Sequence, residues 1–158
     1  MTRIGVTGHR RLPYAVLEFV IAGIEKELAR DEPVQALSSL AAGADQLFAR
    51  IALDRGIPVT AVIPGMDYEA HLGDEEDVAA YRSILDECHR REDLPLAPTH
   101  EEAYAAAGHW IVDHADRLVA VWDGHPARGH GGTGEVVAYA RERGVPVTVL
   151  WSEGVSRP

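Results

Sequence analysis

Three glycine-bearing loops contain the residue types that bind phosphate groups. They span residues 7–11, 41–46 and 122–135. Glycine lets a backbone approach a ligand closely and adopt positive φ. A helix that starts just after such a loop points free N–H groups and a partial positive charge at an anion. The candidate ligand-binding residues are Gly8, His9, Arg10, Gly43, Asp45, Asp123, Gly131, Gly132, Thr133 and Gly134.

The third loop carries the strongest phosphate-binding pattern. Its Gly131-Gly132-Thr133-Gly134 run opens a predicted helix, and the alternative interpretation is a tight turn that Thr133 caps. Arg10 and Arg11 in the first loop are suited to bidentate phosphate contacts, or else lie on the solvated surface. The spacing is not that of a Walker A motif, and no GxGxxG follows the first apolar run. Rossmann-type dinucleotide binding therefore has no local support.

Three carboxylates are candidates for a functional role. Asp123 follows an apolar run, where it is placed to bind a ribose hydroxyl, to act as a base or to cap the next turn. Asp45 and Glu135 lie in the first turns of predicted helices, where stabilising the helix N-terminus competes with a ligand role. Asp123 and Glu135 are the candidate catalytic residues, because a positioned carboxylate can activate water beside a bound glycoside.

The sequence predicts neither a metal site nor a cofactor. There are 8 histidines, but no HExxH motif or similar pairing occurs, and a protein metal site needs three or four converging ligands. The loop residues His125 and His130 are instead candidates for ligand contact. Cys88 is the single cysteine, which excludes an intramolecular disulfide and a cysteine-based metal site.

The elements that would position these loops follow a β-α-β pattern, in which apolar runs alternate with amphipathic stretches. The pattern predicts a three-layer α/β protein with a parallel sheet and helices on both faces. Residues 1–158 are expected to form a single domain. In such sheets ligands bind beyond the carboxyl ends of the strands, where the three loops lie. Strands are predicted at 3–7, 34–40, 57–63, 94–97, 116–122 and 147–151, and helices at 17–28, 44–52, 76–90, 99–114 and 133–143.

The composition and charge of the chain limit the kinds of partner that it can bind. The chain has a net charge of −10, with 25 acidic and 15 basic residues. Double-stranded nucleic acid is not expected as a partner, because binding many phosphates requires a basic face. No apolar segment is long enough to span a bilayer, and the N-terminus enters a strand-like run directly. We therefore expect a cytoplasmic protein without a membrane partner. A nucleotide or a related small phosphorylated ligand remains compatible with this charge, because two or three local groups can hold it.

The order and spacing of five motifs resemble the SLOG superfamily, a Rossmann-like group that includes the LOG phosphoribohydrolases and the DprA DNA-processing proteins. The similarity extends from Gly5 to about Leu150. It implies a modified Rossmann fold that binds nucleotides or nucleotide-derived ligands at the glycine-rich loops. LOG-type proteins are commonly dimers, so the resemblance also implies a homodimer. The motifs are Thr7-Gly8-His9-Arg10, Leu40–Asp45, Ala115–Gly124, Gly131–Glu135 and Gly144–Val147.

The catalytic residues of the LOG enzymes are not matched. Their PGGxGTxxE signature ends in a glutamate that works with an upstream arginine, and these positions fall on Val136 and near Ala107. Glu135 is one residue too early, which rotates it by about 100° on a helix. The sequence is also similar to the nucleoside deoxyribosyltransferases. The position of their nucleophilic glutamate differs from that of Glu135 by the same single residue.

Three hypotheses follow from these observations. The first is a nucleotide-binding domain that serves as a sensor or carrier. The second is an N-glycoside hydrolase that acts on nucleoside 5′-monophosphates through Asp123 or Glu135. The third is an oligomeric scaffold with a vestigial pocket.

Overall fold

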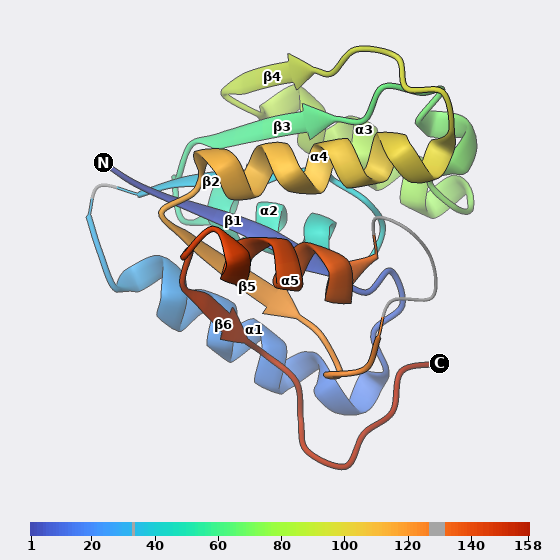
Figure 1. Cartoon of the computed structure of the whole chain (residues 1–158). Helices are drawn as coiled ribbons and strands as arrows, with labels where there is room; N and C mark the ends of the chain where they lie inside the picture. The colour runs from blue at the N-terminus through green and yellow to red at the C-terminus, as the bar shows by residue number, and fades with distance from the viewer. Residues whose placement is uncertain (33, 127–131) are drawn as a thin grey trace.

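The computed structural model describes residues 1–32, 34–126 and 132–158, and in these residues a six-stranded parallel sheet forms the centre of the molecule (Figure 1). The strand order is β4-β3-β2-β1-β5-β6. All neighbouring strands are parallel. The strands are β1 (Thr2–Gly8), β2 (Val34–Ser38), β3 (Val59–Ile63), β4 (Arg90–Asp93), β5 (Arg117–Val121) and β6 (Val147–Val149).

Helices cover both faces of the sheet and produce the predicted three layers (Figure 1). On one face lie α1 (Tyr14–Ala29), α2 (Ala44–Asp54) and α3 (Glu75–Glu87); on the other lie α4 (His100–His114) and α5 (Thr133–Glu142). Two hydrophobic clusters fill the layers, one on each side of the sheet. Since both faces are covered, the inner strands are rich in buried apolar residues, and every residue of β3 is buried.

The strand order reverses at β1. The chain passes from β1 outward through β2 and β3 to β4, and α4 then returns it to β5 on the other side of β1. Thr7 pairs with Ala120 and Gly8 with Val121, so the two central strands end side by side. A crevice opens at such a reversal because the loops that follow the two strands diverge, and ligands of this fold class bind there.

Two glycines allow α4 and α5 to approach the central strand. A Cβ atom at Gly5 in β1 would lie 2.4 Å from Cγ2 of Ile111 in α4, and one at Gly108 in α4 would lie 2.6 Å from Cγ2 of Val136 in α5. Such separations are not tolerated in a packed interior. Glycine at these points therefore brings α4 onto β1 and α5 onto α4.

One edge of the sheet differs from the sequence prediction. We predicted a helix to residue 90 and an edge strand at 94–97, but α3 ends at Glu87 and the edge strand is Arg90–Asp93. The four residues of β4 are all charged and mostly exposed, because a strand at the edge of the sheet buries little surface. Hydrophobic periodicity does not detect such a strand.

The other elements agree with the prediction to within a few residues, and the predicted cap of α4 is confirmed. Oγ1 of Thr99 accepts a hydrogen bond from the Glu102 amide at 3.1 Å. The acidic stretch before α3 contains the short 3₁₀ helix η1 (Glu69–His71) and a reciprocal cap between Asp74 and Asp77.

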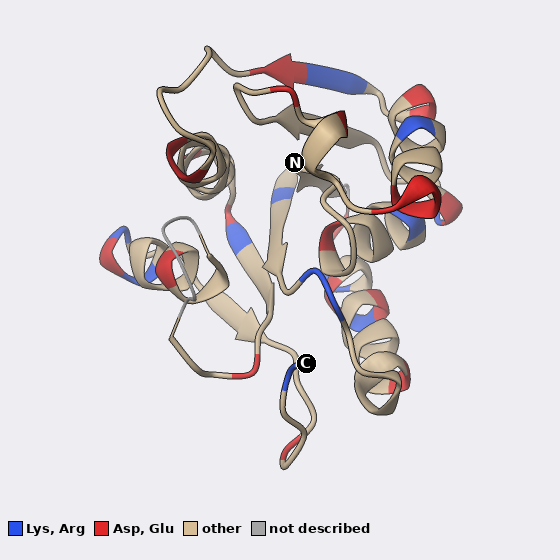
Figure 2. Ribbon diagram, turned by 90° about the vertical axis from the view of Figure 1, so that its right-hand side faces the viewer, with Lys and Arg blue, Asp and Glu red and all other residues tan. Residues whose placement is uncertain are grey.

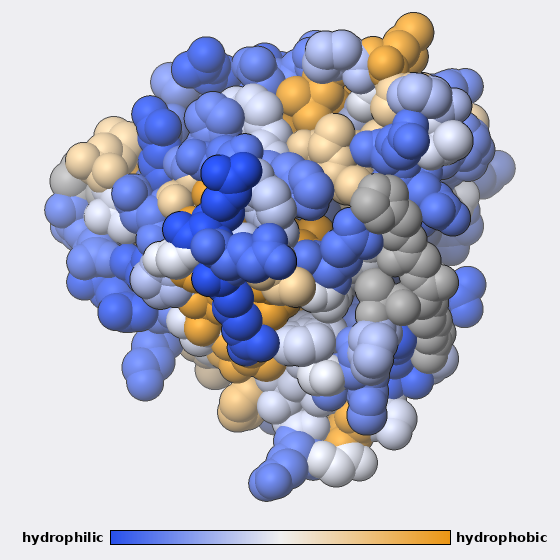
Figure 3. Space-filling view, in the orientation of Figure 1, coloured by the Kyte–Doolittle hydropathy of each residue, from blue (hydrophilic) through white to orange (hydrophobic). Residues whose placement is uncertain are grey.

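Charge and hydropathy are distributed unevenly over the surface. Figure 2 looks onto the edge where the strands end and shows acidic residues mainly on the surrounding helices. Figure 3 shows a largely hydrophilic surface over α4 and apolar atoms around β6, where Val149 is 40% exposed. Within the described residues, no helix has the length and apolar character needed to cross a bilayer.

Candidate functional site

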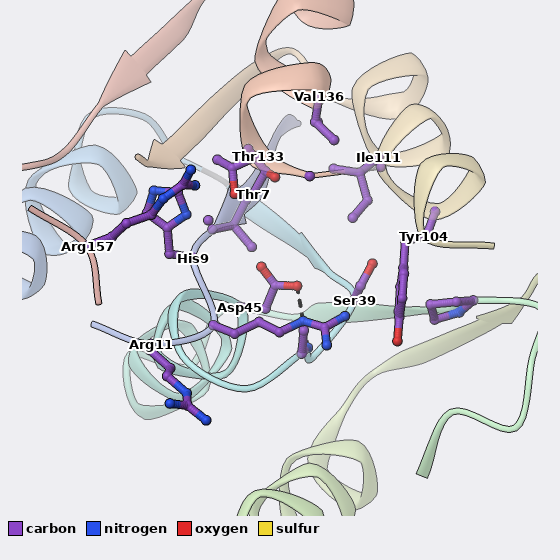
Figure 4. Close-up of a pocket in the computed structure, with 18 of the residues that line it drawn as sticks. Thr7, His9, Arg11, Ser39, Asp45, Tyr104, Ile111, Thr133, Val136 and Arg157 are labelled. Carbon is purple, nitrogen blue, oxygen red and sulfur yellow. Dashed lines mark hydrogen bonds between the residues drawn. The ribbon is translucent and has the colours of Figure 1, made fainter. Parts of the chain in front are cut away.

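A cavity of about 550 Å³ lies at the carboxyl edge of the sheet, where β1 and β5 end (Figure 4). Its walls come from the loops after β1 and β3, the loop after β2 with the first turn of α2, the middle of α4, the first turn of α5 and the end of the chain. The first and third glycine-bearing loops thus contribute to one cavity, although they begin more than 110 residues apart in the chain.

The loop after β1 contributes a continuous run, Thr7 to Arg11, to the cavity wall. Gly8 is needed here for contact with the protein itself, since a Cβ atom would lie 2.4 Å from Cβ of Ala44. His9 is 8% exposed, and its carbonyl oxygen accepts a hydrogen bond from the Ala44 amide at 3.1 Å. These contacts fix the loop against the start of α2.

Gly43 joins the first two loops and is not one of the cavity-lining residues. It has φ +80°, and a Cβ atom there would lie 2.4 Å from the carbonyl oxygen of Arg10 and 2.6 Å from that of His9. From the sequence, such glycines were predicted to allow the close approach of a ligand. In the structure, the close approach at Gly43 is between two segments of the chain.

The first turn of α5 opens onto the cavity through Gly132 and Thr133. Gly132 is the N-cap residue and has no side chain with which to cap the helix, so Thr133 is not the cap that the alternative interpretation required. The amides of a first helical turn lack intrahelical acceptors and favour an anion. Gly134 and Glu135 follow in the helix but do not line the cavity, and Gly131 lies outside the described residues.

Asp45 places a carboxyl group in the middle of the cavity. Its side chain points toward Thr7 and Thr133 in Figure 4, and Oδ2 accepts a hydrogen bond from the Ala41 amide at 3.4 Å. Burial raises the pKa of Asp45 to about 7, against the opposing effects of the Ala41 N–H and the Arg10 guanidinium. A buried carboxyl group that titrates near neutrality is a feature of functional sites.

Aromatic side chains form the wall beside Arg10. The Arg10 guanidinium carbon lies 4.6 Å from the centroid of the Tyr104 ring, a cation–π contact, and Tyr68 lies next to Tyr104 at 6.4 Å between ring centroids. Both tyrosines and Ser39 line the cavity. Sequence reasoning did not select these three residues, because no motif includes them and their distances along the chain carry no pattern.

Asp123 lies beside the cavity rather than in its wall. Its side chain is 2% exposed, and its Oδ1 accepts a hydrogen bond from the His125 amide at 3.0 Å and lies 3.2 Å from Nε2 of His9. Oδ2 lies 3.3 Å from Nε of Arg157. Burial alone would raise the pKa of Asp123, but the His125 N–H, His9 and Arg157 together lower it. This carboxylate links three segments of the protein.

The segment after β6 returns to the cavity, and Arg157 and Pro158 line it. The Trp151 ring packs edge-on against His9 with 5.3 Å between centroids, and its Nε1 donates to the carbonyl of Val155 at 2.6 Å. The sequence resemblance ends near Leu150, and this segment has no pattern of its own. No signal in the sequence therefore pointed to Arg157.

The positions of the two LOG catalytic residues also face the cavity. Val136 and Ala107 both line it, so the alignment of motifs places the family's glutamate and arginine positions in the wall. Here both side chains are apolar. Asp45 supplies the one carboxylate side chain among the described lining residues. Nowhere in the described parts of the chain do three His, Cys, Asp or Glu residues converge as metal ligands.

Comparisons with solved structures identify the fold. DNA processing protein A from Helicobacter pylori superposes with a TM-score of 0.69 at 14% identity, covering 99% of this chain and 68% of that protein. DNA processing protein A from Streptococcus pneumoniae gives 0.64 at 19% identity over 98% of this chain, which spans 52% of the longer protein. The molybdenum cofactor binding protein from Rippkaea orientalis gives 0.62 at 17% identity, covering 94% and 75% of the two chains.

No protein-family model matches the sequence, and a search of curated proteins finds no significant relative. The similarity to the solved structures is therefore a similarity of fold. It agrees with the resemblance that the five motifs indicated, and the chain shares the Rossmann-like α/β fold of these solved structures.

Proposed function

We propose that this protein binds a nucleotide or a nucleotide-derived phosphorylated ligand in the cavity at the ends of β1 and β5. The observation that carries the proposal is the convergence of the first turn of α5 with Arg10, Arg11 and Arg157 on one cavity. The chain as a whole has a net charge of −10, so a group of three arginines around one cavity is a local exception. It favours an anionic ligand.

The shape and lining of the cavity support a ligand of nucleotide size. Its volume of about 550 Å³ is within the range of small-molecule sites. The lining combines helix amides and guanidinium groups, which suit a phosphoryl group, with the ring of Tyr104, which suits a base. The related folds are compatible with this role, since one of them belongs to a binding protein for the molybdenum cofactor.

A long nucleic-acid strand is a less suitable ligand. The Helicobacter pylori protein of similar fold binds single-stranded DNA. A groove that tracks a strand, however, needs basic residues along its length. Here the acidic residues predominate, and the cavity is confined to the ends of the central strands. We therefore propose a single small ligand, with the protein acting as its sensor or carrier.

Thermal unfolding in the presence of nucleotides tests this proposal. A ligand at 100 times its dissociation constant adds about 2.7 kcal/mol to the free energy of unfolding. We expect at least one of the four common nucleoside 5′-monophosphates to raise the melting temperature, and the corresponding nucleoside to raise it less. If no nucleotide raises the melting temperature, the proposal is wrong and a scaffold with a vestigial pocket is the better account.

Hydrolysis of the N-glycosidic bond is a second candidate function, favoured by Asp45. A carboxyl group with a pKa of about 7 can protonate a departing base while water adds to C1′ of the sugar, so that the C1′–N bond breaks. This candidate assigns the acid to Asp45 rather than to Asp123 or Glu135, which do not line the cavity. Incubation with nucleoside 5′-monophosphates and chromatography for free base decides between hydrolysis and binding alone.

A further inference from the structure

The end of the chain contributes a cationic side chain that is already held in place. Arg157 lines the cavity and its side chain is 15% exposed. Its Nε lies 3.3 Å from Oδ2 of Asp123, and its Nη2 donates to the carbonyl oxygen of Pro126 at 2.9 Å. An arginine fixed at two points loses little further conformational entropy when a ligand binds.

The two sides of the cavity differ in chemistry. Figure 4 shows His9 and Arg157 on one side and Tyr104 on the opposite side, with Asp45 and Thr133 between them. The Tyr104 side is aromatic and its cation, Arg10, already lies over the Tyr104 ring. The other side combines the Arg157 guanidinium with the first turn of α5, and both are donors suited to phosphoryl oxygens.

Resting on the proposed nucleotide binding, we propose that Arg157 contacts the phosphoryl group of the ligand and that the base lies on the opposite side of the cavity, beside the stacked Arg10 guanidinium and Tyr104 ring. Asp123 is then a positioning residue. It holds Nε of Arg157 and lies against His9, while its own carboxylate stays outside the cavity wall. This assignment gives the ligand a direction within the cavity and assigns a role to a segment that the glycine-rich motifs do not include.

Isothermal titration of wild type and the Arg157→Gln variant tests the assignment. The probes are the tightest-binding of AMP, GMP, CMP and UMP and its own nucleoside. Losing a charge-assisted hydrogen bond weakens binding by about 10- to 100-fold. We expect Arg157→Gln to weaken the affinity for the nucleotide to this extent and to leave the affinity for the nucleoside unchanged. The matched control is Arg55→Gln, which removes an exposed arginine at the end of α2, outside the cavity.

The outcomes separate this inference from the proposed function. If wild type binds the nucleotide and Arg157→Gln binds it equally well, the assignment of Arg157 is overturned while nucleotide binding stands. Equal weakening of nucleotide and nucleoside also overturns it, because Arg157 would then contact the nucleoside part. If wild type binds none of the four nucleotides, both proposals fail. Circular dichroism and the melting temperature of each variant show that it is folded.

A double-mutant cycle tests the positioning role of Asp123. If Asp123 acts through Arg157, Asp123→Asn weakens nucleotide binding in the wild-type background and has a much smaller effect in the Arg157→Gln background. Equal weakening in both backgrounds would show that Asp123 acts independently of Arg157, and would overturn this part of the inference.

Discussion

Nε2 of His9 lies 3.2 Å from Oδ1 of Asp123, although 114 residues separate the two in sequence. The contact joins the loop that follows β1 to the loop that follows β5, at the point where the strand order reverses. The backbone amide of Asp123 also lies 3.2 Å from the same ring nitrogen. A neutral ring with an unprotonated Nε2 accepts from this amide, whereas a protonated ring donates to the carboxylate. Both protonation states therefore keep the two loops together.

Replacement of Asp123 by alanine is expected to destabilise the protein. The change leaves the His125 amide and the Arg157 guanidinium without a carboxylate partner in a region that is largely buried. Loss of such partners costs about 1–3 kcal/mol. Urea denaturation measures this cost, and Asp86→Ala, at an exposed position of α3, is the matched control. Equal stability of the two variants would show that Asp123 does not hold the loops together.

Replacement of Gly43 by alanine is expected to destabilise the protein more than replacement of Gly56. Both glycines have positive φ, +80° and +74°, so alanine is strained at each position, and Gly43 also has ψ −123°, which lies outside the left-handed helical region. At Gly43 a Cβ atom would also lie 2.4 Å from the carbonyl oxygen of Arg10, whereas nothing lies within 4 Å of one at Gly56. Chemical denaturation of both variants compares the costs. Equal losses of stability in the two variants would show that the loops around Gly43 accommodate the added Cβ atom without cost.

The stability of the protein is expected to depend on the ionisation of Asp45. Its pKa is raised from 3.8 to about 7 on folding, so between these values the folded state binds more protons than the unfolded state. The contribution of this carboxyl group to the free energy of unfolding is therefore complete below about pH 4. The contribution is lost as the pH rises through 7, by up to about 1.4 kcal/mol per pH unit.

The Asp45→Asn variant tests this dependence. The variant keeps a neutral side chain of similar shape, so its stability relative to wild type should rise between pH 5 and pH 8. Asp86→Asn, at an exposed position, corrects for the change in net charge. Urea denaturation at several pH values provides the comparison. A constant difference between Asp45→Asn and wild type across this range would contradict the assigned burial of the carboxyl group.

The sequence predicted the sheet and most helices because both faces of the central strands are covered. Full burial produces the apolar runs of β3 and β5, and the capping residue Thr99 marks the start of α4. The edge strand β4 was missed, since its four charged residues are exposed and carry no apolar periodicity. The bounds of an inner strand can be predicted from its local apolar pattern. An exposed edge strand has no such pattern, because it forms by pairing with the neighbouring strand in the folded protein.

The candidate site was predicted only in part. The glycine-bearing loops and Asp45 were located because local motifs mark the turns between strand and helix. Tyr104 and Arg157 were missed, because each reaches the cavity through tertiary packing, one from the middle of α4 and one from the end of the chain. Asp123 was identified as important, but its role as a buried link between loops depends on His9 and Arg157, which no local pattern connects to it.

Titration of a nucleoside 5′-monophosphate into wild type and the Thr133→Trp variant tests the central claim most directly. Thr133 lines the cavity at the first turn of α5 and is 8% exposed, so an indole at this position would occupy the space proposed for the ligand. Ala138→Trp, at an exposed position of the same helix, is the control. The account predicts that wild type and Ala138→Trp bind the nucleotide and that folded Thr133→Trp does not. Equal binding by all three proteins would contradict it, because the ligand would then lie elsewhere.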